Sequence, residues 1–289
     1  MRFQIRAGSA GCQADGEYGY AGAAEVIASP TGDSALYGPL RSILGGMIGT
    51  HAPPAARLES VSKLYGTFAA LRSVSVEFPL GSSTVVLGDN GAGKSTLLRL
   101  LAGLITPSRG KVAVFTDTPQ KQRHRIAYMS HDAMLYDELS AMENLRYFAR
   151  LHAEGGCGGS CTGSPEMALR AVGLDPELTR PVGQYSQGMR QRASLARVLQ
   201  TDPELLLLDE PFSNLDVDSA RHMVKLLLDF RTWPVVGPLE GPGADAVRGR
   251  TIVLTTHQAK LAEPLADTIL HMSAGAIVST THAAAMAAR

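Results

Sequence analysis

The chain has 289 residues, 45% of them hydrophobic, which is enough to bury the core of one large or two small globular domains. Its 27 basic and 27 acidic residues cancel, so we expect neither nucleic acid nor an anionic membrane as a direct partner. Three cysteines are too few for a disulfide framework, no apolar run approaches the roughly 20 residues of a membrane-spanning helix, and the N-terminus does not resemble a signal peptide.

Residues 1–56 are rich in Gly, Ala and Ser and end near Pro53-Pro54. We expect a poorly ordered extension, or residues read from an upstream start codon, rather than a domain. Organised sequence is expected over residues 57–280, followed by a C-terminal tail at 281–289.

Two stretches with alternating apolar residues, 58–61 and 74–78, predict antiparallel strands. Tyr65 lies between them. Its ring could stack on an adenine, because stacking needs only a flat face, or it could pack at the end of a strand. The residues alone favour neither interpretation.

A strand, a glycine loop and a helix then follow in the order that a P-loop requires, at 84–87, 88–96 and 97–102. Glycines let backbone N–H groups turn toward phosphates, and the helix N-terminus adds partial positive charge. Lys94 can reach the β- and γ-phosphates and act in catalysis, and the Ser95 hydroxyl can bind Mg²⁺. We therefore predict nucleoside triphosphate binding, with these residues as ligands: Gly88, Asp89, Asn90, Gly91, Ala92, Gly93, Lys94, Ser95 and Thr96.

Further strands are predicted at 111–115 and 126–129, and a helix at 140–152 with Ser140 as its N-cap. A glycine-rich loop at 155–163 carries Cys157 and Cys161. This pair could bind a metal or form a disulfide, but no second pair completes a four-ligand site.

A helix is predicted to begin at Ser186, and the run 205–208 after it is apolar throughout, as in a parallel strand covered on both faces. The strand ends in Asp209 and Glu210, at the sheet edge where open α/β sheets bind ligands. Asp209 is predicted to bind Mg²⁺, and Glu210 to orient or deprotonate the attacking water.

Residues 213–216 read as a turn and a helix N-terminus, 251–256 as a β-branched strand, and 268–280 as two short strands. The segment 233–250 reads as a surface loop. His257 ends the β-branched strand. A lone histidine there is usually structural, but after a P-loop and an Asp-Glu pair we predict that it contacts the γ-phosphate.

These motifs, in this order, resemble the ATP-binding cassette family over roughly residues 57–280. The resemblance implies an α/β P-loop NTPase fold: a RecA-like mixed sheet core, an antiparallel β subdomain, and a helical subdomain at about 132–200. It implies Mg²⁺ and ATP as cofactors and two cassettes clamped head to tail, a homodimer for a single-cassette chain. The nucleotide ligands that it adds are Tyr65, Ser186, Gly188, Met189 and Asp216, of which Ser186 and Gly188 complete the site of the other copy.

Two positions depart from the family pattern: His131 stands where glutamine is usual, and residues 185–189 differ from the usual signature. Both resemble the ATP-binding subunits of bacterial haem exporters of cytochrome c maturation, as do residues 135–141 and 143–146. His131 is predicted to approach Mg²⁺, which imidazole can do only while neutral, or else to face solvent or a partner.

The resemblance implies the ATPase subunit of a bacterial export complex, a peripheral protein at the cytoplasmic face of the inner membrane that drives separate transmembrane permease subunits. Haem is the expected cargo, with a drug, lipid or polysaccharide exporter as alternatives. A soluble cassette acting on DNA or ribosomes fits less well, because no sustained heptads and only one cassette occur.

Overall fold

The computed structural model describes residues 54–154, 163–233, 235 and 249–282. All of them belong to one compact unit, His51–Arg289. The predicted extension up to residue 53, the Cys157 and Cys161 loop and most of the predicted surface loop at 233–250 lie outside the described residues.

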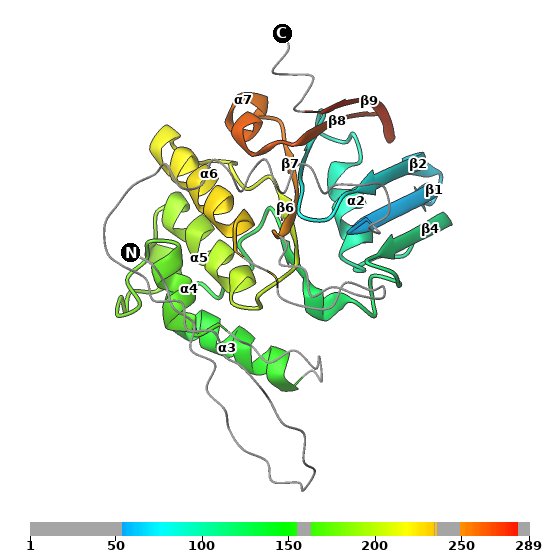
Figure 1. Cartoon of the computed structure of the whole chain (residues 1–289). Helices are drawn as coiled ribbons and strands as arrows, with labels where there is room; N and C mark the ends of the chain where they lie inside the picture. The colour runs from blue at the N-terminus through cyan, green and yellow to red at the C-terminus, as the bar shows by residue number, and fades with distance from the viewer. Residues whose placement is uncertain (1–53, 155–162, 234, 236–248, 283–289) are drawn as a thin grey trace, which may run out of the picture. The chain divides into compact units, whose positions relative to one another are not determined.

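Three antiparallel strands form a small sheet in the order β2-β1-β4, at the right of Figure 1. They are β1 (Ala56–Tyr65), β2 (Phe68–Phe78) and β4 (Arg109–Val114). β1 begins one residue before the expected boundary at 57, and Ala55 is already fully buried. The strands predicted at 58–61, 74–78 and 111–115 are therefore confirmed, and they come together in one sheet.

The larger sheet has six strands in the order β5-β6-β7-β3-β8-β9, and only the last pair is antiparallel. The strands are β3 (Ser83–Leu87), β5 (Ile126–Met129), β6 (Leu205–Asp209), β7 (Thr251–Thr256), β8 (Thr268–Ser273) and β9 (Ala276–His282). β9 thus runs two residues past the expected boundary at 280.

Alternate residues of the central strands enter two different hydrophobic cores. On β6, Leu206 and Leu208 pack in the core that holds α3–α6, while Leu205 and Leu207 pack in the core that holds α2 and the small sheet. Figure 1 shows α2 beside the small sheet and the other helices across the large sheet. A strand covered on both faces has no polar side, which explains the leucine run.

Within the described residues, the helices longer than one turn are α2 (Lys94–Leu101), α3 (Ala141–Glu154), α4 (Pro165–Ala171), α5 (Gln187–Leu199) and α6 (Val217–Arg231), and α7 (Ala259–Ala262) is a single turn. The helices α3, α4 and α5 fall within residues 132–200. The helix predicted after Ser140 is confirmed, because Ser140 and Glu143 exchange side-chain to backbone hydrogen bonds as a capping box. The apolar residues of this helix are only partly buried, since Leu145 is inaccessible but Leu151 is 45% exposed.

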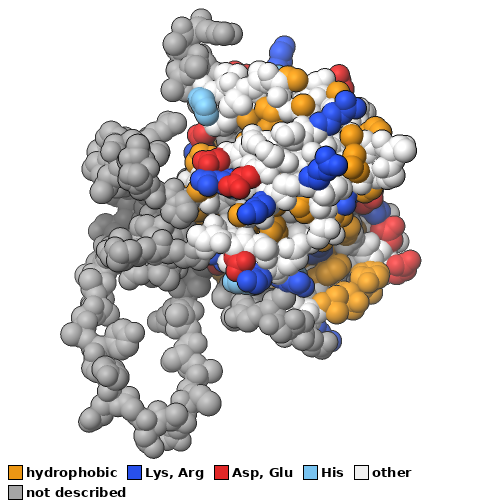
Figure 2. All heavy atoms as spheres, turned by 90° about the vertical axis from the view of Figure 1, so that its right-hand side faces the viewer, with side chains coloured by type: hydrophobic (Ala, Val, Ile, Leu, Met, Phe, Trp, Pro, Cys, Tyr) orange, Lys and Arg blue, Asp and Glu red, His pale blue; other side chains and the backbone are white. Residues whose placement is uncertain are grey.

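The surface over the small sheet is electrostatically mixed. Figure 2 shows Lys and Arg side chains interspersed with Asp, Glu and apolar side chains on this face. None of the helices in the described part of the chain combines the length and the hydropathy needed to cross a bilayer.

Candidate functional site

The loop between β3 and α2 needs glycine at two of its positions because of the backbone around them. Gly88 has a φ of 157°, and a Cβ there would lie 2.4 Å from the Met272 carbonyl oxygen. At Gly93, with a φ of 101°, a Cβ would lie 2.5 Å from the Ala70 carbonyl oxygen. Both contacts are with backbone atoms, which cannot rotate away, so the close approach of β8 and β2 to the loop depends on these glycines.

A pair of glycine substitutions tests this requirement. We expect Gly88→Ala to lower the free energy of unfolding by about 3 kcal/mol or more, because backbone strain adds to the clash with Met272. Gly91→Ala is the matched control: Gly91 also has a positive φ, but nothing lies within 4 Å of its Cβ position, so about 1 kcal/mol is expected. Urea unfolding followed by circular dichroism measures both, and equal losses would contradict the role of Met272.

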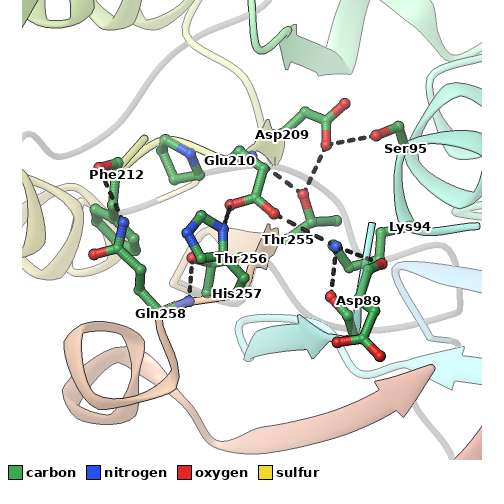
Figure 3. Close-up of polar contacts among 12 residues, drawn as sticks. Asp89, Lys94, Ser95, Asp209, Glu210, Phe212, Thr255, Thr256, His257 and Gln258 are labelled. Atoms are coloured by element: carbon green, nitrogen blue, oxygen red, sulfur yellow. Dashed lines mark hydrogen bonds and ion pairs between the residues drawn. The ribbon is translucent and has the colours of Figure 1, made fainter. Parts of the chain in front are cut away.

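Lys94, the first residue of α2, turns back over the loop. Its side chain is only 6% exposed, and its Nζ donates to the carbonyl oxygens of Gly88 at 2.6 Å and Asp89 at 3.2 Å. The same Nζ lies 3.5 Å from Glu210 Oε1. Figure 3 shows these contacts converging on one ammonium group. The loop therefore concentrates positive charge where the predicted phosphates would lie.

Asp209, at the end of β6, is 3% exposed and accepts three hydroxyl hydrogen bonds. Its Oδ1 accepts from Ser95 at 3.0 Å and from Thr255 at 2.7 Å, and its Oδ2 accepts from Tyr128 at 3.2 Å. Burial, with the nearby charge of Asp209, raises the pKa of the Tyr128 hydroxyl, so this hydroxyl stays protonated and donates. A hydrogen bond to Tyr128 raises the pKa of the Arg99 guanidinium.

Glu210 follows directly, with a φ of 50° that is unusual for a residue with a side chain. Its backbone N–H donates to the Thr255 carbonyl oxygen at 3.1 Å, which pins the turn. Its side chain lies between two basic groups: Oε1 faces Lys94, and Oε2 lies 3.0 Å from His257 Nδ1. A carboxylate held in this way can accept a proton from a water beside the P-loop.

These residues line a cavity of about 800 Å³. Of the predicted site residues, it brings together Tyr65, Asp89, Asn90, Gly91, Ala92, Gly93, Lys94, Ser95, Thr96, His131, Asp209, Glu210 and His257. Tyr65, the last residue of β1, lines this cavity and is 47% exposed, so part of its ring is accessible and adenine stacking stays a prediction. His131 is exposed at the same cavity.

Five of the predicted nucleotide ligands do not line the cavity: Gly88, Ser186, Gly188, Met189 and Asp216. Gly88 lies at the start of the P-loop, and the other four belong to the α5 and α6 region. Ser186 caps α5 by accepting from the Met189 N–H at 3.2 Å, and Asp216 caps α6 by accepting from the Ser219 N–H at 2.9 Å. Gly188 is buried, and a Cβ there would lie 2.7 Å from Ser219 Oγ. In this copy these residues therefore fix how α5 and α6 begin and pack.

Several residues of the site were not predicted from the sequence. Phe68 is 61% exposed beside Tyr65, and the other unpredicted lining residues are Ala70, Arg99, Ser130, Asp132, Ser213, Asn214 and Gln258. Tyr128 and Thr255 were missed although they contact Asp209 directly. A hydroxyl within a fully buried strand, as at Thr255, was an available signal, because such a group must find a partner.

The site can accommodate a divalent cation with a phosphate ligand. Ser95 Oγ and Asp209 Oδ1 are hard oxygen donors 3.0 Å apart at the start of α2. Mg²⁺ is usually held by one or two such protein groups and completed by phosphates and water, rather than by a full protein cage. The donor chemistry therefore fits Mg²⁺.

The family and the proteins that this chain resembles are ATP-binding components of transporters. A family profile described as "ABC transporter" matches residues 71–213. The fluoroquinolones export ATP-binding protein of Mycobacterium tuberculosis (strain CDC 1551 / Oshkosh) is 34% identical over 83% of this chain and 73% of its own length. The ATP-binding protein NatA of Bacillus subtilis (strain 168) is 30% identical over 72% and 80%, and the phosphonates import protein PhnC of Thiobacillus denitrificans (strain ATCC 25259 / T1) is 33% identical over 78% and 86%.

Solved structures share the fold. A dimeric ATP-binding cassette in a post-hydrolysis state, bound to ADP and Pi, superimposes with a TM-score of 0.65 over 78% of this chain and 98% of that one, at 23% identity. The cbiO1 protein of Clostridium perfringens gives a TM-score of 0.65 over 82% and 92%, at 24% identity. The fold is therefore the predicted α/β P-loop cassette.

Proposed function

The chain belongs to the ABC transporter family and is an ATPase, and from this premise we propose that it is the ATP-hydrolysing subunit of a bacterial export complex. Relatives that are named as ATP-binding proteins of transporters imply transmembrane partners for this chain as well. The proposed place of work is the cytoplasmic face of the inner membrane, as a peripheral subunit.

The observation that carries the proposal is the position of Glu210 between Lys94 and His257, one residue after Asp209. In the proposed mechanism Lys94 and the P-loop N–H groups bind the phosphates, and Tyr65 stacks on the adenine. Glu210 takes the proton from the attacking water, while His257 orients that carboxylate and reaches the γ-phosphate. The contacts of Glu210 with Lys94 and His257 and the partly exposed ring of Tyr65 support these roles.

Ser95 and Asp209 would hold Mg²⁺, which supplies charge neutralisation for the β- and γ-phosphates when it is bound. His131 lies at the same cavity and is proposed as a further metal contact.

A second copy of the chain is proposed to complete the site. Ser186, Gly188, Met189 and Asp216 lie outside the cavity of their own copy, which supports the proposal that they contact nucleotide across a dimer interface. One similar cassette is a dimer in its post-hydrolysis structure, which supports this arrangement. The exposed N-terminus of α5, at Ser186, would present its partial positive charge to the phosphates of the other copy.

Export is the proposed direction of transport because several relatives are named for it, including the proteins for fluoroquinolone and Nod factor export. Importers such as the phosphonate protein are also similar, so the direction is a proposal. Haem export for cytochrome c maturation stays a prediction that depends on His131 and residues 185–189. Drug export is the second candidate, which the fluoroquinolone and daunorubicin relatives favour.

Affinity purification of the full-length chain from solubilised membranes of its own cell tests the proposal. We expect transmembrane subunits to co-purify, and the complex to hydrolyse ATP faster than the isolated chain. Haem or drug stimulation of that activity then separates the two cargo candidates. A chain recovered only with ribosomes or DNA would overturn the transporter assignment.

A further inference from the structure

Thr255 lies in β7 directly opposite Asp209 of β6 in the parallel ladder. Its side chain has no exposed surface, and the residues before it on the strand, Ile252 to Leu254, are all apolar core. Valine would fill the same volume in such a place without burying a hydroxyl. The hydroxyl therefore needs an explanation other than packing.

The explanation lies in the two hydrogen bonds of its oxygen. Thr255 Oγ1 donates its single proton to Asp209 Oδ1 at 2.7 Å and accepts from the Glu210 N–H at 3.1 Å. The Thr255 carbonyl oxygen accepts from that same N–H at 3.1 Å. One residue thus contacts both Asp209 and the strained backbone of Glu210 (Figure 3).

We propose that Thr255 is a positioning residue that sets the metal-binding carboxylate of Asp209 and the base Glu210 relative to each other. This inference rests on the proposed function of the site. Oδ1 of Asp209 also accepts from Ser95, the other proposed Mg²⁺ ligand, so the Thr255 proton determines which way that oxygen points. Tyr128 restrains the opposite oxygen from β5, and the carboxylate is therefore held from the strands on both sides of β6.

Loss of the Thr255 hydroxyl should impair only the metal-dependent steps. In Thr255→Val the Lys94 and P-loop contacts are untouched, so ATP affinity measured in EDTA should equal that of wild type. Affinity for Mn²⁺ in the presence of a non-hydrolysable ATP analogue, followed by the EPR signal of free Mn²⁺, should fall about tenfold, as should kcat. Thr255→Ser keeps the hydroxyl and should restore both values to within about twofold of wild type.

Thr251→Val is the matched control. Thr251 stands on the same strand, is 1% exposed, and accepts from the Gly81 N–H at 2.9 Å, at the end of β7 away from Asp209. It should change thermal stability without changing Mn²⁺ affinity. Normal Mn²⁺ affinity in Thr255→Val, or equal defects in the Val and Ser variants, would overturn the proposal in favour of a packing role.

Glu210→Gln measured in parallel separates this inference from the function on which it rests. If Glu210→Gln hydrolyses ATP like wild type, the proposed function of the site fails. If Glu210→Gln is inactive while Thr255→Val retains full Mn²⁺ affinity and turnover, only the role of Thr255 fails.

Discussion

Replacing Glu210 by glutamine should lower steady-state ATP hydrolysis by roughly 10²–10⁴-fold, the usual contribution of a general base. Glutamine keeps the shape of the side chain but loses the basicity that accepts a proton from water. ATP affinity should change little, because the P-loop and Lys94 contacts with phosphates remain. We expect the variant to accumulate as an ATP-bound dimer, because hydrolysis would no longer separate the two copies of the proposed dimer.

Steady-state phosphate release and nucleotide titration measure the two quantities, and size-exclusion chromatography with ATP detects the dimer. Glu77→Gln is the control, because Glu77 on β2 forms an exposed ion pair with Arg57 on β1, and neither residue lines the cavity. Turnover near that of wild type in Glu210→Gln would exclude Glu210 as the base. A parallel loss in Glu77→Gln would point to the stability of the fold instead.

Lys94→Ala should weaken ATP binding itself by about 10–100-fold, because a charged hydrogen bond to phosphate contributes about 1.5–3 kcal/mol. The ammonium is already aimed into the cavity by the Gly88 and Asp89 carbonyl oxygens, so little ordering is needed when phosphates arrive. Removing it also leaves Glu210 without its neighbouring cation. Turnover should therefore fall further than affinity.

Equilibrium titration with a fluorescent ATP analogue measures the affinity, and thermal unfolding without nucleotide reports on the fold. Lys94→Met retains most of the apolar stem and should show the same loss of affinity with less disturbance of the buried site. Lys121→Ala removes a 70% exposed lysine paired with Asp117 and should bind ATP normally. Unchanged affinity in both Lys94 variants would mean that the phosphates bind elsewhere.

Much of the site was predictable because its residues occur in short contiguous motifs. The loop from Gly88 to Thr96 carries its own strand, turn and helix signals, so its structure follows from local conformational preferences. The leucine run before Asp209 predicted a strand buried on both faces, and β6 does pack its alternate leucines into the two cores on either side of the sheet. The helix caps at Ser140, Ser186 and Asp216 are equally local.

Contacts between residues that are distant in the sequence could not be predicted from local sequence patterns. Tyr128 reads as one more residue of a strand, and only the pairing of β5 with β6 brings its hydroxyl to Asp209. The helical spacing after Ser140 does not distinguish the buried Leu145 from the exposed Leu151, because the width of the covered face depends on the neighbouring helices. Gly188 was expected at a partner's nucleotide, and its burial against Ser219 depends on how α5 packs on α6.

By itself the sequence determined the chemical groups of this site and the order in which they occur, because a P-loop, a strand ending in carboxylates and a strand ending in histidine are each encoded by neighbouring residues. Only the tertiary structure decided which of those groups touch. The strands β6 and β7 are neighbours in the sheet, but Asp209 on β6 and Thr255 on β7 lie 46 residues apart in the sequence. Which side chains come into contact across such a distance depends on strand register and burial. Both are set by the packing of the whole core rather than by any local stretch of sequence.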